Sequence, residues 1–495
     1  MSTNSQEYDL TVVGGGPAGY LAAERAAARG KRVALVTDQP PGGVCLSVGC
    51  IPTKTLLSVS KHAAERGSWK TMGLAYAKPK IDMNTLIDYK DKTVATLQGG
   101  VASLLRRHKV TTYRGRGQLL APGRVAVHPS DSADRSAPEQ EITSRYVLLA
   151  TGSEALVPPI PGVSEGIENG AVMTSTEALA ARTLPGRVVV IGGGYIGMEF
   201  ATFYAQLGCT VQVVEIAPTI LATLSGVPND VVLAHLPPME LLTAHTVTQV
   251  AGKPSAVNVT VRDTTGAEST LETDVVLLAA GRVPRWRGVA AQALNLATDR
   301  RGIQVDDYLQ TNLPGVYAAG DCTGRAMLAH AAYRMAEVAV EHMFRADRAQ
   351  SQDQAPLAAG RNRWPVRMQW NQVPWVVFTN PEISGCGMSE NEALAAGYDA
   401  VAVSVSMRMS GRYLAEHPEE KGQLSLVAER GSGKLLGVRC VGSGASELVH
   451  TVAVLLHTRA TVEALQSAIF PHPTVSEVLR EAAWAIDVDR PAANH

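Results

Sequence analysis

The sequence has few cysteines, few aromatic residues and no excess of charge of either sign. Its 495 residues include six cysteines, too few for the disulfide framework of a small secreted protein. Aromatic residues make up 5% of the chain, so its cores must be mostly aliphatic and rich in alanine. The 45 Lys and Arg residues against 46 Asp and Glu leave a net charge of −1. The chain therefore lacks the basic stripe that attracts nucleic acid and the acidic tail that attracts cationic partners.

Long apolar runs and a targeting segment are also lacking. We find no run near the roughly 18 apolar residues that a membrane span needs. No basic segment precedes the strand-like residues 9–13, so we expect no signal peptide. These absences predict a cytoplasmic protein with no membrane or nucleic-acid partner. The length predicts about three domains of ~150 residues each.

The most informative segment is residues 42–54, which read GGVCLSVGCIPTK. Cys45 and Cys50 are close enough to form a small, reducible ring, and the glycines in front of them let the backbone approach a cofactor. A pair of buried structural cysteines and half of a metal site are the alternatives. The spacing differs from the CxxC of a zinc site, and no CxxC partner occurs elsewhere, so we predict a redox pair and no metal. The remaining cysteines should be small buried apolar residues: Cys209, Cys322, Cys386 and Cys440.

Two strand–glycine loop–helix–strand units occur, at residues 10–36 and 187–214. In the first, Gly14 allows the tight turn, Gly16 lets the backbone meet a pyrophosphate, and Gly19 packs the helix on the strand. The helix N-terminus then faces the phosphates with its positive end. The second unit repeats these positions at Gly192, Gly194 and Gly197. Two such loops in the same register predict two dinucleotide sites.

The residue that ends the second strand of each unit differs between the two copies. In the second copy it is Glu215, whose carboxylate can bind both ribose hydroxyls and repel a 2′-phosphate. Residues 216–220 contain no arginine to bind that phosphate, so we predict NAD rather than NADP. In the first copy the same position is Thr37, followed by Asp38. Either Asp38 reaches the ribose of the nucleotide there, or Thr37 or water takes its place.

His472 is the candidate acid–base residue. An unperturbed histidine titrates near pH 6.5, so it can take a proton from a thiol and return it. Glu477 lies five residues further on and can orient the ring, as the third group of a catalytic triad does. A structural histidine in a Pro-rich turn is the alternative. We predict that the His472–Pro473 bond is cis.

These motifs resemble those of the class I FAD-dependent pyridine nucleotide–disulfide oxidoreductases over nearly the whole chain. The Ile-Pro-Thr-Lys ending of the cysteine segment is most similar to the dihydrolipoamide dehydrogenase branch. The other matching segments are residues 195–199, the Gly320-Asp321 pair, residues 327–330 and residues 470–477.

The resemblance assigns FAD to the first glycine loop, NAD to the second, and a homodimer to the whole. It implies that Cys45 exchanges with a dithiol substrate while Cys50 lies against the flavin. His472 and Glu477 would act in the active site of the partner subunit. Lys54 and Glu199 would form an ion pair near the flavin; a solvated surface lysine is the alternative. The implied cofactor contacts are Asp38, Lys54, Gly117, Thr151, Gly152, Asp321 and Ala329 for FAD, and Tyr195, Glu215, Val247 and Gly281 for NAD. Packing is the alternative for Tyr195 and Val247, and a structural turn for Thr151 and Gly152.

The predicted fold is α/β, with two Rossmann-like nucleotide-binding domains and a C-terminal α+β dimerisation domain. In the last domain we expect strands at 375–378, 401–407, 423–429 and 435–441 and a helix at 446–458. Residues 128–140 and 345–362 read as polar insertions, and Pro237-Pro238 should break a helix. The predicted divisions are 1–155 and 280–346 for the FAD domain, 156–279 for the NAD domain, 347–372 for a linker and 373–495 for the interface domain.

The expected function is oxidation of protein-bound dihydrolipoyl groups with NAD⁺, so the expected partner is a lipoyl-bearing carrier or a 2-oxo acid dehydrogenase complex. A related disulfide reductase, such as one for glutathione, is the first alternative. A mercury enzyme would need a cysteine pair in residues 488–495, which is absent. The alternative of another class is a non-catalytic flavoprotein scaffold.

Overall fold

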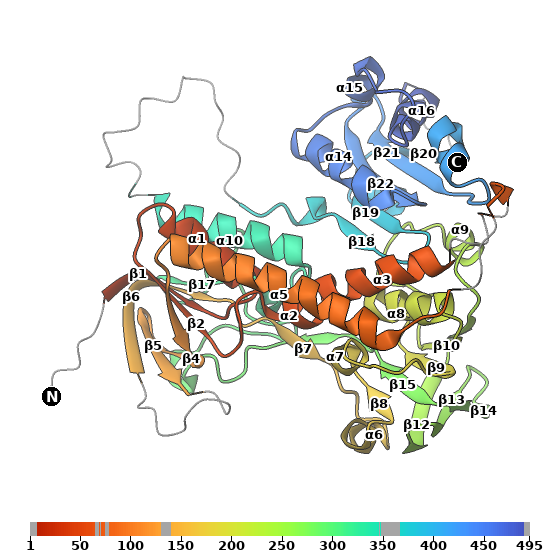
Figure 1. The fold of residues 1–495 in the computed structure, drawn as a ribbon. Helices are drawn as coiled ribbons and strands as arrows, with labels where there is room; N and C mark the ends of the chain where they lie inside the picture. The colour runs from red at the N-terminus through yellow and green to blue at the C-terminus, as the bar shows by residue number, and fades with distance from the viewer. Residues whose placement is uncertain are drawn as a thin grey trace. The chain divides into compact units, whose positions relative to one another are not determined.

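The computed structural model describes residues 7–64, 69, 71–74, 79–129, 140–345, 347 and 367–489 (Figure 1). The chain forms two compact units, each built from three segments. The first unit comprises residues 1–52, 89–156 and 282–370. The second comprises residues 53–88, 157–281 and 371–495. The NAD domain and the interface domain expected from the sequence both fall within the second unit.

A largely parallel sheet forms the centre of the first unit, with strand order β3-β2-β1-β6-β5-β4 and β17 paired with β6. Its strands are β1 (Glu7–Val13), β2 (Val33–Thr37), β3 (Thr111–Arg114), β4 (Arg116–Ala121), β5 (Arg124–His128), β6 (Gln140–Leu149) and β17 (Val316–Ala318). All five residues of β2 are buried, as expected for a strand covered on both faces. Helices α1 (Pro17–Ala27) and α10 (Ala329–Met343) lie side by side.

The predicted FAD contacts of the first unit follow the carboxyl ends of these parallel strands. Gly14 follows β1, Asp38 follows β2, Thr151 comes two residues after β6, and Asp321 comes three residues after β17. Nucleotides bind at this edge of an open α/β sheet, beside the point where the strand order reverses. The topology therefore brings together residues that lie up to 307 positions apart, from Gly14 to Asp321.

The second unit contains another parallel sheet, with strand order β11-β10-β9-β15-β8. Its strands are β8 (Val172–Met173), β9 (Arg187–Ile191), β10 (Thr210–Glu215), β11 (Glu240–Thr243) and β15 (Val275–Leu278). An antiparallel sheet of β12 (Thr246–Lys253), β13 (Ala256–Arg262) and β14 (Glu268–Thr273) accompanies it. Helix α8 (Tyr195–Gln206) follows β9 directly after the second glycine loop. The two predicted Rossmann-like units are thus present, one in each compact unit.

The interface domain is an antiparallel sheet with helices packed against it. The strand order is β18-β19-β22-β21-β20, and the strands are β18 (Trp375–Val377), β19 (Ile383–Gly387), β20 (Ala400–Ser406), β21 (Gln423–Glu429) and β22 (Leu435–Val441). Helix α14 (Ala445–His457) packs on β19 and β22, and α16 (Glu477–Ala485) packs on β20 and β21. The predicted strands and helix of this domain agree with the observed bounds to within one residue. This confirms the mixed α+β class.

The remaining elements are short segments or helices that connect the sheets. They are α2 (Gly43–Val48), α3 (Cys50–Ala64), α5 (Met83–Arg107), β7 (Ser153–Ala155), α6 (Val163–Asn169), α7 (Ser175–Ala178), α9 (Asn229–Leu233), β16 (Arg282–Pro284), α12 (Glu390–Ala395), α13 (Gly411–Glu416) and α15 (Val462–Ser467), with 3₁₀ turns at Gln292–Leu294, Asp321–Thr323, Trp370–Gln372 and Met407–Met409.

Two expectations about the chain need comment. Helix α9 ends at Leu233, and β11 begins at Glu240, so Pro237-Pro238 lies in a loop as predicted. We expected no apolar stretch near the length of a membrane span, and this expectation was wrong by the criteria of length and composition. The helical stretch Gly43–Ala64 is long and apolar enough to cross a membrane, and a third of its most apolar window is buried, although a core helix passes the same test.

Several predicted features lie outside the described residues. These are most of the 128–140 and 345–362 insertions, most of the 347–372 linker and the end of the 488–495 segment.

Candidate active site

The first glycine loop closes tightly against the end of β6. Gly14 has φ 110°, and a Cβ there would lie 2.2 Å from the carbonyl oxygen of Ala150. A Cβ on Gly19 would lie 1.8 Å from the Gly14 oxygen, so α1 can approach only without one. A Cβ on Gly16 would meet no heavy atom within 4 Å among the described residues. Gly16 precedes Pro17, the first residue of α1, so the loop presents open space to a phosphate at a helix N-terminus.

The second glycine loop repeats this construction in the other unit. Gly192 has φ 108°, and its Cβ would lie 2.4 Å from the Ala279 oxygen. A Cβ on Gly197 would lie 1.8 Å from the Gly192 oxygen. A Cβ on Gly194 would again meet nothing within 4 Å in the described part of the chain. Both loops therefore have the shape that a dinucleotide pyrophosphate requires.

Glu215 is bonded to the loop that it was predicted to serve. Its Oε2 accepts a hydrogen bond from the N–H of Gly193 (2.6 Å), and its Oε1 accepts one from the N–H of Ala217 (2.8 Å). The half-buried carboxylate is therefore fixed at the carboxyl end of β10, beside the glycine loop. A carboxylate held there can accept hydrogen bonds from the ribose of a nucleotide.

The corresponding position of the first unit is built differently. Thr37 is buried, its Oγ1 lies 2.7 Å from the position of a Cβ on Gly15, and it donates a hydrogen bond to the carbonyl of Gln39 (2.9 Å). Asp38 pairs instead with Arg116, at 3.6 Å between Oδ2 and Nε. Thr37 thus occupies the place that Glu215 has in the second loop, and Asp38 has an ion-pair partner that the sequence did not indicate.

The cysteine pair lies against the first glycine loop. The N–H of Gly42 donates to the Gly15 oxygen (2.7 Å), and a Cβ on Gly43 would lie 2.5 Å from the Cα of Gly16. Cys45 is in the first turn of α2, and Cys50 is the first residue of α3. Both are half-buried. A helix N-terminus stabilises a thiolate, so both sulfurs are placed for redox chemistry.

The other four cysteines are buried, as predicted. Burial raises the thiol pKa to about 11 for Cys209 and Cys386 and to about 12 for Cys322, and it also raises that of Cys440. Such thiols stay protonated at neutral pH and are poor nucleophiles.

Lys54 and Glu199 form the predicted ion pair. The Lys54 Nζ lies 2.9 Å from Oε1 and 2.8 Å from Oε2 of Glu199, whose side chain is 6% exposed. The sequence did not reveal Phe378, whose N–H donates to Glu199 (3.1 Å) and whose ring centroid lies 4.7 Å from the Lys54 ammonium. Lys54 is therefore paired, with a side chain that is 33% exposed, and is not a fully solvated surface lysine.

Asp321 lies in a polar cluster with two residues that were not predicted. Ser153 Oγ donates to Asp321 Oδ2 (2.6 Å), and Arg282 donates from Nε to Ser153 Oγ (2.8 Å). Burial raises the pKa of the Asp321 carboxyl, against the hydrogen bond from Ser153 and the charge of Arg282. Burial lowers the pKa of Arg282, and the charges of Asp321 and Cys50 oppose this shift. Arg282 therefore lies near Cys50.

A pair of tyrosines in the first unit was also missed. Tyr20, in α1, donates from its hydroxyl to that of Tyr333, in α10 (2.8 Å), and the ring centroids are 6.0 Å apart. Burial raises the pKa of both phenols, and the charge of Cys45 raises each of them further. Both hydroxyls thus stay protonated close to the cysteine pair.

The remaining predicted contacts have mixed surroundings. Gly152 has φ 76°, and a Cβ on it would meet no heavy atom within 4 Å in the part of the chain that the structure describes. Thr151 Oγ1 donates to the carbonyl of Arg285. A Cβ on Gly117 would lie 2.8 Å from Cγ1 of Val13, so this glycine packs on β1. Val247 is buried in a hydrophobic core cluster, which agrees with packing, the alternative given for it. The others lie at the ends of elements: Tyr195 and Ala329 are the first residues of α8 and α10, and Gly281 follows β15 with φ 121°.

His472 and Glu477 form the predicted pair at an exposed turn. His472 Nδ1 lies 2.9 Å from Glu477 Oε1, and the His472–Pro473 bond is cis. The N–H of Thr474 donates to Glu477 Oε2 (2.9 Å), and this bond, followed by that to His472, lowers the pKa of the Glu477 carboxyl. The imidazole is 78% exposed, so its ring is held from one side and presents the other outward.

Comparison with known proteins decides the family. Residues 8–336 match the model of the pyridine nucleotide-disulphide oxidoreductases, and residues 373–483 match their dimerisation domain. The chain belongs to this family. A dihydrolipoyl dehydrogenase of Pseudomonas aeruginosa is 36% identical over 485 residues, covering 96% of each chain. One of Halobacterium salinarum is 35% identical over 482 residues, covering 96% of this chain and 95% of that one.

A solved structure shares the fold. It is that of the HOCl-induced flavoprotein disulfide reductase RclA from Escherichia coli, with a TM-score of 0.79 and 24% identity over 97% of this chain and all of that one. Family membership supports FAD and NAD as the cofactors, and the second matched domain supports a homodimer. No group of three or more His, Cys, Asp or Glu residues suited to a metal ion was found within the described ranges.

Proposed function

We propose that this protein is a cytoplasmic dihydrolipoyl dehydrogenase, which oxidises protein-bound dihydrolipoyl groups with NAD⁺. The observation that carries the proposal is the placement of Cys45 and Cys50 in the first turns of the consecutive helices α2 and α3, the first of which begins against the first glycine loop. The names of the most similar relatives support the substrate. A lipoyl-bearing carrier protein or 2-oxo acid dehydrogenase complex is then the partner.

The first step is thiol–disulfide exchange at Cys45. His472 of the partner subunit takes a proton at Nε2 from one substrate thiol, since Glu477 of the partner subunit holds Nδ1. The substrate thiolate attacks Cys45 Sγ, and the Cys45–Cys50 bond breaks with Cys50 as the leaving thiolate. The second substrate sulfur then displaces Cys45, which closes the cyclic disulfide. The substrate loses two electrons and two protons. The cysteine pair gains both electrons; one proton stays on the imidazole of His472 of the partner subunit, and Cys45 takes the other as it leaves as a thiol.

The chain's own charges favour this outcome. The N-terminus of α3 stabilises the Cys50 thiolate, and the nearby Arg282 cation does the same. FAD, held at the first glycine loop, would supply the two-electron chemistry that links the cysteine pair to NAD⁺. Lys54, fixed by Glu199, provides a positive charge that favours the reduced state of that group.

The choice of NAD rests on the second glycine loop. The carboxylate of Glu215 is fixed at the loop and would repel a 2′-phosphate, and residues 216–220 contain no arginine to offset this repulsion. We therefore expect NAD⁺ to be the acceptor and NADPH to be a poor donor in the reverse reaction.

The FAD-loaded protein should reduce NAD⁺ with dihydrolipoamide and show little oxidation of NADPH with oxidised glutathione. Cys45→Ser and Cys50→Ser should each abolish the reaction. Cys209→Ala is the matched control: it removes a buried thiol outside the cysteine pair and should keep the activity. Under stopped flow, two-electron reduction should produce a thiolate-to-flavin absorbance band that Cys50→Ser lacks. Activity only with NADPH and glutathione would favour the glutathione-type reductase, and a protein without the band would be the scaffold.

A further inference from the structure

Arg439, on β22 of the interface domain, is a buried cation that the proposed chemistry does not use. Its side chain is 5% exposed. Burial lowers the pKa of the guanidinium, and the charge of Glu392 opposes the shift. A buried charge is costly unless hydrogen bonds and a counter-charge satisfy it. The hydrogen-bond partners of Arg439 therefore indicate the role of this buried charge.

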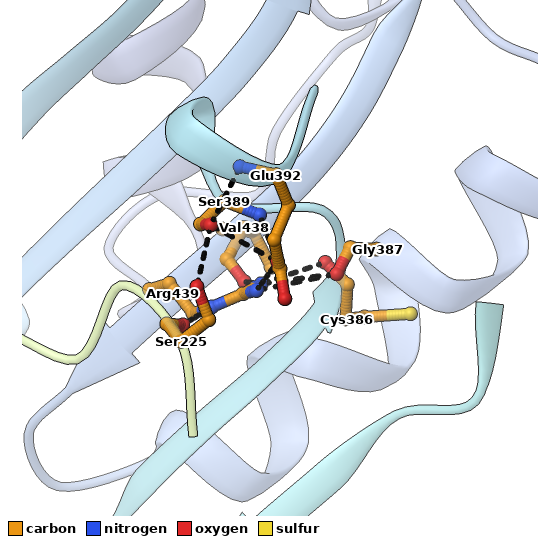
Figure 2. A network of polar contacts seen from close by, with 7 residues as sticks. All are labelled: Ser225, Cys386, Gly387, Ser389, Glu392, Val438 and Arg439. Atoms are coloured by element: carbon orange, nitrogen blue, oxygen red, sulfur yellow. Dashed lines mark hydrogen bonds and ion pairs between the residues drawn. The ribbon is translucent and has the colours of Figure 1, made fainter. Parts of the chain in front are cut away.

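Most of these contacts lie within the interface domain (Figure 2). Nη1 donates to the carbonyl oxygens of Val438 (2.9 Å), Cys386 (3.3 Å) and Gly387 (3.3 Å). Nη2 donates to Gly387 again (3.3 Å) and to Oε2 of Glu392 (3.2 Å). The planar fork of the guanidinium is thus locked onto β19 and the neighbouring helix α12.

The remaining donor of Arg439, Nε, bonds to the loop of residues 216–228, which follows β10 in the NAD domain. Nε donates to the carbonyl oxygen of Ser225 (2.6 Å), the shortest of its bonds (Figure 2). The hydroxyls of Ser225 and Ser389 are 2.7 Å apart, which adds a second link at the same place. A Cβ on Gly226, at φ 73°, would lie 2.8 Å from Cβ of Ser389, so the loop packs closely here. This link could not be predicted from the sequence, because its ends are 214 residues apart.

The same loop also packs on the second glycine loop and bonds to its backbone. The N–H of Leu221 donates to the Gly193 oxygen (2.9 Å), and Cγ2 of Ile220 lies 3.2 Å from the position of a Cβ on Gly193. Because Glu215 accepts from the Gly193 N–H, both polar groups of this glycine are bonded. The N–H of Leu224 donates to the Leu221 oxygen (2.8 Å) and continues the chain of contacts to Ser225.

Leu221 has a backbone conformation that needs such support. Its φ is 53°, in the left-handed region that a leucine rarely adopts, and its side chain is buried. Such a conformation is unfavourable for a leucine and persists only where the surroundings hold it. One end of the loop is fixed by the bond from Ala217 to Glu215, and the other by Arg439.

We propose that Arg439 is a positioning residue for the pyridine-nucleotide site. From the interface domain it fixes Ser225, and through residues 220–225 it keeps Gly193 in the conformation that receives the nucleotide. The inference rests on the proposed function in one respect, that the second glycine loop binds NAD. The interface domain then contributes to NAD affinity without touching NAD.

The test is NAD⁺ binding to the oxidised, FAD-loaded protein, measured by equilibrium dialysis. Arg439→Lys keeps the charge but loses the fork, so the dissociation constant for NAD⁺ should rise about tenfold. The KM for dihydrolipoamide and the flavin spectrum should change little, whereas the melting temperature should fall because buried carbonyl oxygens lose a donor. Arg430→Lys is the matched control, because Arg430 is a half-buried arginine of the same domain, 19% exposed, that pairs with Asp399. It should leave NAD⁺ binding unchanged.

Two results would overturn the inference. One is a folded Arg439→Lys protein whose NAD⁺ dissociation constant stays within twofold of wild type. The other is a loss of NAD⁺ binding matched by an equal loss in the rate at which dihydrolipoamide reduces the flavin in the absence of NAD⁺, which would assign Arg439 a structural role only. If Arg439→Lys does not fold, Ser389→Ala removes the second link and should weaken NAD⁺ binding severalfold; unchanged binding would contradict us. A wild-type protein that binds no NAD⁺ would instead refute the proposed function.

Discussion

Lys54 and Glu199 show how much a single residue depends on its partner. Glu199 is nearly buried, with its two oxygens bonded to Lys54 and to the N–H of Phe378, while the Lys54 side chain is 33% exposed. Removal of the lysine leaves the carboxylate with only the bond from Phe378. A buried carboxylate without a counter-charge is strongly destabilising, whereas loss of both charges together is much less so.

We expect Lys54→Met to lower the free energy of unfolding by about 2 kcal/mol, less than for a fully buried pair because Lys54 is partly solvated. The double variant Lys54→Met with Glu199→Leu should recover part of this loss. Urea denaturation of the four proteins measures both effects. Arg124→Met is the control: it breaks an exposed pair with Glu141, so the free energy of unfolding should hardly change. A double variant less stable than both single variants would refute the argument.

Glu477 works on His472 through one hydrogen bond. Glu477→Gln should reduce kcat for dihydrolipoamide by about 10²-fold, within the range typical of general acid–base catalysis. Reduction of the oxidised protein by NADH should be unaffected, because that half-reaction does not use the imidazole. Stopped-flow absorbance separates the two half-reactions. Equal loss in both would mean that the substitution disturbs the fold rather than proton transfer.

The pH dependence of this effect follows from the depressed pKa of Glu477. The pKa of Glu477 is lower in the folded protein than its ordinary value of 4.5. The stabilisation by its hydrogen bonds to Thr474 and His472 is therefore fully present above pH 4.5 and is lost as the pH falls through the folded-state pKa. The Glu477 carboxyl should therefore stay ionised down to about pH 4.5 and become protonated only below it, as followed by carbon-13 NMR of the glutamate carboxyl groups. A Glu477 carboxyl that takes up its proton above pH 4.5 would contradict this.

At the scale of elements, a helix and a strand approach each other only through glycine. Gly197→Ala would place a Cβ 1.8 Å from the Gly192 oxygen and push α8 away from its loop. Overpacking of this kind costs about 1–3 kcal/mol, and a cost of this size in the nucleotide-binding conformation of the loop should lower NAD⁺ affinity roughly 5- to 150-fold. FAD should remain bound, because its loop lies in the other unit.

NAD⁺ dialysis and the flavin absorbance of the same sample measure the two outcomes of Gly197→Ala. The control is Gly100→Ala in α5, where a Cβ would meet nothing within 4 Å among the described residues. It should leave both cofactors bound and stabilise the helix by roughly 0.5–1 kcal/mol. Loss of both cofactors from Gly197→Ala would show that the two loops are not independent.

Elements were predicted well where short spacings determine them. The glycine loops, the strands of the interface domain and the His472–Glu477 pair all depend on residues within one element or one turn. Contacts between distant elements could not be found in this way. Ser153 and Arg282 reach Asp321 from other segments, and Tyr333 reaches Tyr20 across 313 residues. Only the topology of the sheets brings such residues together.

At the scale of the whole molecule, the proposed active site needs two chains. Cys45→Ser and His472→Gln homodimers should each be inactive. A heterodimer of the two variants would carry both defects in one site and none in the other. Random mixing makes about half of the dimers heterodimers, and one of the two sites in each heterodimer is intact. The mixture should therefore recover about a quarter of the wild-type activity per site.

Co-expression with two different affinity tags allows this mixture to be purified and assayed. If cysteines and imidazole instead met within one chain, every site would carry one defect and no activity would return. The exposure of His472, at 78%, is consistent with a role in a second subunit.

The double attachment of Glu215 has a consequence for coenzyme exchange. The carboxylate that would discriminate between the two nicotinamide coenzymes also fastens the backbone at Gly193 and Ala217. An engineer who replaces it with a neutral or basic side chain to admit the phosphorylated coenzyme therefore also loosens the turn that must cradle either one. Switching preference in this protein should require compensating changes behind the turn, and single substitutions should yield an enzyme poor with both.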